Sequence, residues 1–197
     1  VDKYNLPVIP VVDSSGSIRG IVTFDDVLDA VQDEHSEDML RMAGTTAIHP
    51  YYEPIYMGVA KRLPFLLVTL TGCIGVLLVQ EHFKELITLP GLMLMVLPIV
   101  HLISGLSGNV AVVTSTVFVR GLATGEIYPG RISRAVWQEL LIGLLIGLVI
   151  AVLVGLVLSL FFQEKYGRDT ILVVVCGLFA SIAWAAVIGA LVPVFCR

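Results

Sequence analysis

Residues 140–163 read LLIGLLIGLVIAVLVGLVLSLFFQ and contain no charged side chain. As a helix this stretch is about 36 Å long, more than the hydrocarbon core of a bilayer, which is about 30 Å thick. It therefore predicts a membrane-spanning helix. Three other long apolar stretches occur in the chain. Together the four predict a polytopic α-helical membrane protein with spans near residues 63–80, 86–119, 137–163 and 170–196.

The composition of the 197-residue chain agrees with that class. Hydrophobic residues make up 57% of it and charged residues 14%, and its mean hydropathy is +0.93. In a soluble domain roughly half of the residues are apolar and about a quarter are charged. The three cysteines lie singly in apolar stretches, so we expect them to act as small apolar side chains in the membrane. The chain opens on Val1, part-way into a predicted structural unit, and we expect it to be part of a longer protein.

The charged residues predict which ends of the spans face the cytoplasm. One set of ends is flanked by Lys61, Arg62, Arg120, Arg131, Arg134 and Arg197. The opposite ends carry Lys84, Lys165 and Arg168, with acidic residues beside them. The positive-inside rule then places the N-terminal part and the loop between Arg120 and Arg134 in the cytoplasm. We expect a multi-pass protein of the inner (plasma) membrane. Ten of the sixteen acidic residues lie at or before Glu53, so nucleic acid is not an expected partner.

The polar N-terminal part predicts two strands followed by a helix. Residues 8–12 and 18–22 are short β-branched runs, and residues 13–17 (DSSGS) are typical of a turn. Thr23, with Asp26 three residues later, resembles a capping box, so a helix should begin near Phe24.

The first turns of this helix read DDVLDAVQDEHSED, residues 25–38, with seven carboxylates in fourteen positions. Several of these acids are four residues apart, and like charges at this spacing destabilise a helix by a few tenths of a kcal/mol per pair. One interpretation is a solvated helix whose first acids are favoured by the helix dipole. The other is a divalent-cation site, since Mg²⁺ and Ca²⁺ prefer oxygen ligands.

The second apolar stretch, residues 86–119, is unusual in length and content. Its 34 residues would form a helix of roughly 50 Å, longer than a bilayer is thick. Pro90, Pro98 and the segment SGLSGN at residues 104–109 predict an unwound or kinked backbone, which is tolerated at membrane depth only inside protein or along a wet cavity. This stretch is the best pore candidate.

Small residues recur every four positions in the third and fourth stretches, a spacing that lets helix backbones approach closely in lipid. They are Gly143, Gly147, Ala151 and Gly155 in one, and Gly177, Ser181, Ala185 and Gly189 in the other.

Two ionisable residues lie in or near the apolar stretches, and such groups are functional candidates by default. His101 has either a pore role or a hydrogen bond to a neighbouring helix. Glu139 is expected to snorkel to the interface or to pair with Arg131 or Arg134. The sequence contains no Gly-x-Ser-x-Gly, His-Glu-x-x-His, P-loop or dinucleotide-binding motif, so an enzyme is not expected.

The order of these parts resembles a known family. Residues 6–29, LPVIPVVDSSGSIRGIVTFDDVLD, resemble the end of a CBS domain, with its Gly-Ile-Val-Thr-x-x-Asp pattern at Gly20–Asp26. A CBS domain followed by an acidic helix and then by membrane spans is similar to the MgtE family of Mg²⁺ channels. Further agreement comes from RLPFLL (Arg62–Leu67), SGN (Ser107–Asn109), VRGLATGE (Val119–Glu126) and QELLIGLLIGL (Gln138–Leu148).

The resemblance implies a homodimeric channel that transports Mg²⁺ and is closed by cytosolic Mg²⁺. Residues 1–24 would be the small α/β remnant of a CBS domain, residues 25–60 the acidic connecting (plug) helix and linker, and residues 61–197 the transmembrane domain. The regulatory Mg²⁺ ligands carried over from the family are Asp26, Asp29, Glu34, Glu37 and Asp38. The pore-lining residues expected in the second span are Ser104, Gly108, Asn109, Thr114 and Thr116.

The chain departs from the family pattern in two respects. The usual second-span signature has two Gly-Asn pairs, and only Gly108-Asn109 is present here, so the polar lining is thinner. The family also has a fifth span with an Asp-Pro-Ala motif, and these 197 residues contain no such motif.

Two other functions are compatible with the sequence. In the first, the CBS unit binds an adenine nucleotide through Thr23 and Asp26, and the spans serve as a membrane anchor and dimer interface without transport of their own. In the second, His101 and Glu139 form the site of an intramembrane enzyme, for which the sequence offers no partner geometry.

Overall fold

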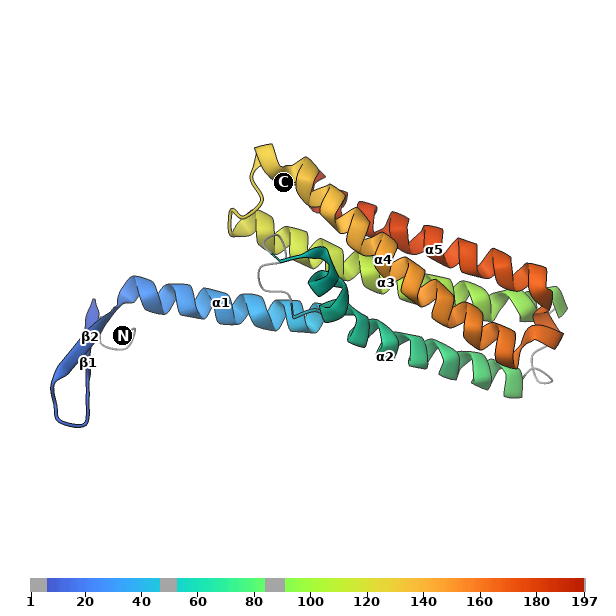
Figure 1. The fold of residues 1–197 in the computed structure, drawn as a ribbon, viewed down its shortest axis with the longest axis horizontal. Coiled ribbons are helices and arrows are strands. Elements are labelled where there is room, and N and C mark those ends of the chain that lie inside the picture. The colour runs from blue at the N-terminus through green and yellow to red at the C-terminus, as the bar shows by residue number, and fades with distance from the viewer. Residues whose placement is uncertain (1–6, 47–52, 84–90, 197) are drawn as a thin grey trace.

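The computed structural model describes residues 7–46, 53–83 and 91–196. A β-hairpin, β1 (Val8–Val12) and β2 (Ile18–Thr23), leads into helix α1 (Phe24–Ala43). The membrane-length helices that follow are α2 (Ile55–His82), α3 (Gly91–Ala123), α4 (Ile132–Phe161) and α5 (Gln163–Phe195), with a short 3₁₀ turn, η2 (Pro129–Arg131), before α4. In Figure 1, α2–α5 form an elongated bundle, and α1 projects from it with the hairpin at its far end. The chain is a polytopic helical membrane protein, as the sequence predicts.

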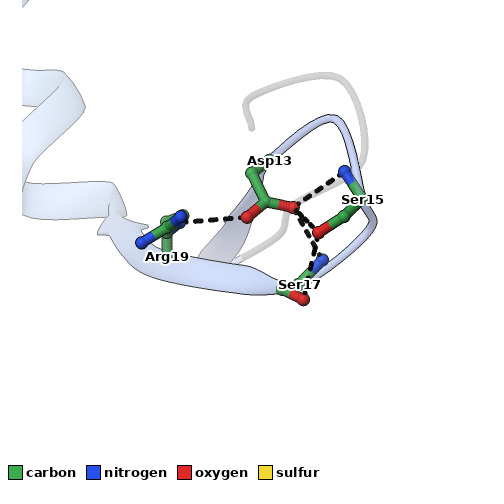
Figure 2. Close-up of polar contacts among 4 residues, drawn as sticks. All are labelled: Asp13, Ser15, Ser17 and Arg19. Atoms are coloured by element: carbon green, nitrogen blue, oxygen red, sulfur yellow. Dashed lines mark hydrogen bonds and ion pairs between the residues drawn. The ribbon is translucent and has the colours of Figure 1, made fainter.

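The hairpin confirms the predicted strand, turn and strand, with β2 one residue longer than expected. β1 and β2 pair antiparallel, with Val8 opposite Thr23 and a register shift between Val11 and Val12. Asp13 organises the turn, as Figure 2 shows: one carboxylate oxygen accepts from the backbone N–H groups of Ser15 at 2.9 Å and Ser17 at 3.0 Å, and the other accepts from Arg19 at 3.0 Å. The hydrogen bond from the Ser15 hydroxyl is the main reason that the pKa of Asp13 is lowered.

Helix α1 begins at Phe24, as the capping box predicts. The Thr23 hydroxyl oxygen accepts from the N–H of Asp26 at 3.2 Å, and the Asp26 carboxylate accepts from the N–H of Thr23 at 2.7 Å. At the other end Gly44 adopts a left-handed conformation, with φ +94°, which a side chain would disfavour. Leu40 in the last turn is fully buried and belongs to an apolar cluster with Phe118 of α3. The helix therefore docks on the bundle by its C-terminal end.

Helix α3 contradicts one expectation. It runs as one helix through Pro98 and through residues 104–109, so the predicted unwinding does not occur there, while a kink at Pro98 remains a prediction. An opened segment would leave backbone groups unsatisfied in hydrocarbon, at several kcal/mol each, whereas Pro98 removes only one donor. The Ser107 hydroxyl donates a hydrogen bond to the Ile103 carbonyl oxygen at 2.6 Å. The other predicted breaker, Pro90, lies outside the described residues.

The small residues of α4 and those of α5 pack against different helices. A methyl group added to Gly143 would lie 2.5 Å from the Cβ of Ala186, so the α4 stripe packs closely against α5. A methyl group added to Gly189, however, would lie 2.6 Å from the carbonyl oxygen of Ala111, which belongs to α3. The α5 glycine stripe therefore does not meet its counterpart on α4. It allows a second close approach, between α5 and α3.

Candidate functional site

Two of the three buried charged side chains in the described part of the bundle form one cluster. Arg62 of α2 donates to both carboxylate oxygens of Glu139 of α4, at 2.6 and 2.8 Å, and the two side chains are 3% and 1% exposed. The Thr114 hydroxyl of α3 donates to the same carboxylate at 3.3 Å and is fully buried. A bidentate guanidinium–carboxylate pair is strong and directional, so this cluster fixes α2, α3 and α4 relative to one another.

This geometry corrects the expectation for Glu139. The residue neither snorkels nor pairs with Arg131 or Arg134, because it lies on the buried side of α4 with Ala135, Ile142 and Gly143. Its partner Arg62 was predicted to flank the first span. Helix α2 instead begins at Ile55, eight residues before the predicted span, and this places Arg62 within the bundle.

A second polar contact joins α2 to α3. The Asn109 amide donates to the Thr69 hydroxyl oxygen at 2.6 Å, and Thr69 donates in turn to the Phe65 carbonyl at 3.1 Å. Asn109 is half-buried, so its side chain lies between the helices and is partly accessible. Thr69 was not predicted from the sequence. The only available signal was a hydroxyl residue in an apolar stretch, which many scaffold helices also contain.

The predicted pore residues of α3 separate into three groups. Ser104 and Gly108, one helical turn apart, are exposed on the same side as His101, and Val112 continues this side at 57% exposure. We call His101, Ser104, Gly108 and Val112 the open face of α3. Asn109 and Thr116 are half-buried, and the Thr116 hydroxyl donates to the Val112 carbonyl at 2.9 Å. Thr114 is buried in the Arg62–Glu139 cluster.

The predicted cation ligands on α1 do not converge on one point. Asp26, Asp29, Glu34 and Asp38 are exposed, and Glu37 forms an ion pair with Arg41. Within residues 7–46, 53–83 and 91–196, no group of three His, Cys, Asp or Glu side chains could hold a metal ion. A cation site at α1 would need ligands from elsewhere, and the assignment remains a prediction.

Asp26 is also the residue predicted to contact a nucleotide with Thr23. One of its carboxylate oxygens already accepts from the Thr23 backbone N–H at 2.7 Å and from the Thr23 hydroxyl at 2.6 Å. Both bonds lower the pKa of Asp26 below its ordinary 3.8, and the bond from the Thr23 hydroxyl is the larger cause. Both side chains thus cap the helix, and their role in nucleotide binding remains a prediction.

Comparison with known proteins identifies the family. The MgtE family profile, described as a divalent cation transporter, matches residues 100–197, and the magnesium transporter MgtE of Thermus thermophilus is 30% identical over 149 residues. The chain belongs to the MgtE family. Similar relatives are the magnesium transporters MgtE of Bacillus subtilis, 29% identical over 151 residues, and of Enterococcus faecalis, 27% identical over 147 residues. These alignments cover 73–75% of the chain and 32% of each relative, so the chain spans about a third of their length.

The match to the family profile, residues 100–197, includes Glu139, Thr114 and the open face of α3. It does not include Arg62 or α1. The profile describes a transporter rather than an enzyme, in agreement with the lack of catalytic motifs in the sequence.

Proposed function

We propose that this chain forms the second-span pore wall of a magnesium channel that works as a homodimer. The observation that carries the proposal is the open face of α3, where His101, Ser104 and Gly108 are exposed on a helix of membrane length. Polar side chains in a membrane usually face protein or a wet cavity, because contact with hydrocarbon is costly. A second copy facing this side would enclose a conduit lined by polar groups.

The chemistry of this face suits a hydrated cation. Mg²⁺ holds its water tightly and is often bound through that water, so neutral hydroxyl and amide oxygens can contact it without replacing the shell. Ser104 supplies a hydroxyl, and the missing side chain at Gly108 leaves room for the ion. Asn109 lies at the edge of the face, where its carbonyl oxygen is not used in the bond to Thr69. Of the other predicted pore residues, Thr116 is half-buried one turn beyond Val112, and Thr114 lies in the buried cluster instead.

The gate proposed for this channel is α1. Its acids Asp26, Asp29, Glu34, Glu37 and Asp38 would bind cytosolic Mg²⁺ together with acidic partners from CBS domains. Without the cation, repulsion among exposed like charges opposes close packing of the arm, and its docking through Leu40 gives it a point about which to move. The hairpin and α1 would then lie in the cytoplasm, and the bundle in the inner (plasma) membrane.

Flux measurements test this proposal. The natural full-length protein is reconstituted in liposomes with an internal Mg²⁺-sensitive dye, and Gly108→Leu is compared with Val152→Leu, a change at an exposed position of α4. Gly108→Leu should abolish most of the flux, and Val152→Leu should leave it unchanged. A wild-type protein without Mg²⁺ flux, or a Gly108→Leu protein with normal flux, would refute the proposal.

The alternative, a membrane-anchored sensor without transport, makes a different prediction. It requires an adenine nucleotide at Thr23 and Asp26 and no flux under any condition. Calorimetric titration of the full-length protein with ATP, and separately with Mg²⁺, distinguishes the two functions. The capping bonds that already engage Asp26 favour the channel.

A further inference from the structure

A cavity of about 270 Å³ lies beside the first turns of α4. Its polar wall is formed by Arg131, Arg134, Gln138 and Glu126. Its apolar wall includes Ile55 at the start of α2 and Leu141 of α4. The cavity thus opens at the level where the polar loop of residues 124–131 meets the membrane helix.

The charge of this cavity is positive although the chain as a whole carries a net charge of −4. The one acidic wall residue, Glu126, forms an ion pair at 3.2 Å with Arg120, which is not a wall residue. In the part of the chain that the structure describes, no acidic side chain forms an ion pair with Arg134. Helix α4 also begins here without a side-chain cap, and the helix dipole adds partial positive charge. An anion is therefore the favoured ligand.

The position of Trp137 indicates the depth of the cavity in the membrane. This wall residue is 62% exposed at the start of a membrane helix, where tryptophan typically marks the interface between headgroups and acyl chains. The volume is just below the range of about 300–1,000 Å³ that encloses drug-sized ligands, so it suits a headgroup whose acyl chains remain in the bilayer.

We propose that this cavity binds the phosphate group of an anionic lipid headgroup, with Arg131 and Arg134 as the charged donors. Guanidinium groups match phosphate geometry, and basic cavities between membrane helices are a known way to recognise acidic lipids. Inorganic phosphate offers the same chemistry and is the alternative source. Because Arg134 and Glu139 lie on the same short segment of α4, a bound headgroup would also support the helix end that holds the buried ion pair.

Native mass spectrometry of the purified full-length protein in detergent tests the proposal. Phosphatidylglycerol, phosphatidylcholine and inorganic phosphate are each titrated against wild type, Arg134→Gln and Arg131→Gln/Arg134→Gln. The control is Arg168→Gln, an exposed arginine outside this cavity. Phosphatidylglycerol should bind wild type and Arg168→Gln equally, and its affinity should fall about fivefold for each arginine removed from the cavity.

Each outcome decides the matter. Saturable binding of phosphatidylglycerol alone, weakened by Arg134→Gln, supports the lipid headgroup. Binding of inorganic phosphate that competes with this lipid and is weakened by the same substitution supports the phosphate site with a soluble ligand. Equal binding of phosphatidylcholine, or phosphatidylglycerol binding that Arg134→Gln leaves unchanged, overturns the proposal. The single variant keeps the test valid if the double variant does not fold.

Discussion

The acidic arm and the helix bundle use charge in opposite ways. On α1 the seven acids of residues 25–38 lie at the surface or half-buried, and the buried residues of the helix are only Ser36 and Leu40. In the bundle, charges are rare, but Arg62 and Glu139 are almost completely buried and hold each other. Water screens the charges on the arm, whereas the pair in the bundle has no such screening. Removal of one charge from the buried pair should therefore lower the stability more than removal of one charge from the arm.

The largest effect is expected from breaking the buried pair. Glu139→Gln leaves the Arg62 guanidinium without its counter-charge, and such a loss typically costs about 3–5 kcal/mol. Replacement of both residues, Arg62→Met with Glu139→Leu, should recover much of this loss because no charge remains buried. Thermal unfolding in detergent measures both variants, with the exposed Glu164→Gln as control. If the double variant is less stable than Glu139→Gln, the interpretation of the pair is wrong.

A smaller effect is expected where the arm meets the bundle. Leu40→Ala removes a fully buried side chain from the cluster around Phe118, and such truncations cost about 2–5 kcal/mol when the site cannot collapse. The arm end can shift, so we expect the low end of this range. Hydrogen exchange in the last turns of α1 should rise for Leu40→Ala and stay unchanged for Met42→Ala, whose side chain is 85% exposed. Equal exchange in the two variants would argue against docking through Leu40.

The polar contact between α2 and α3 should contribute less to stability than the burial of Leu40. Removal of the Asn109–Thr69 hydrogen bond is expected to cost about 0.6 kcal/mol, the average for polar contacts between membrane helices. A double-mutant cycle with Asn109→Leu and Thr69→Val isolates this energy. A coupling near zero would mean that the two side chains do not interact in the membrane.

The smallest effect concerns the helix cap of the arm. Because the pKa of Asp26 is lowered in the folded state, its contribution to stability is complete above the ordinary pKa of 3.8 and is lost as the pH falls through the folded pKa. The protection of the amides at the start of α1, measured relative to their intrinsic exchange rate at each pH, should therefore decrease on acidification below that value. Asp26→Asn should remove this pH dependence, and Asp29→Asn, outside the capping box, should retain it. The same pH response in both variants would contradict the capping role.

The sequence could predict those features that depend on neighbouring residues. Charge-free stretches predicted the four membrane helices, and Thr23 with Asp26 predicted where α1 begins. The candidate site could be predicted only in part. Ser104 and Gly108 share an exposed face, as their four-residue spacing allows, but Thr114 faces the other way.

Hydrophobicity, caps and turns are properties of short contiguous segments, and the sequence by itself therefore determined the class of protein, the number of spans and the turn chemistry at Asp13. The partner of Glu139 lies 77 residues away, at Arg62, and only the tertiary structure decided it. The same holds for the continuity of α3 through Pro98 and for the contact of Gly189 with α3. Each of these features depends on how one helix is rotated and packed against another. Several packing arrangements of two helices have similar local energies, so the local sequence does not select one of them.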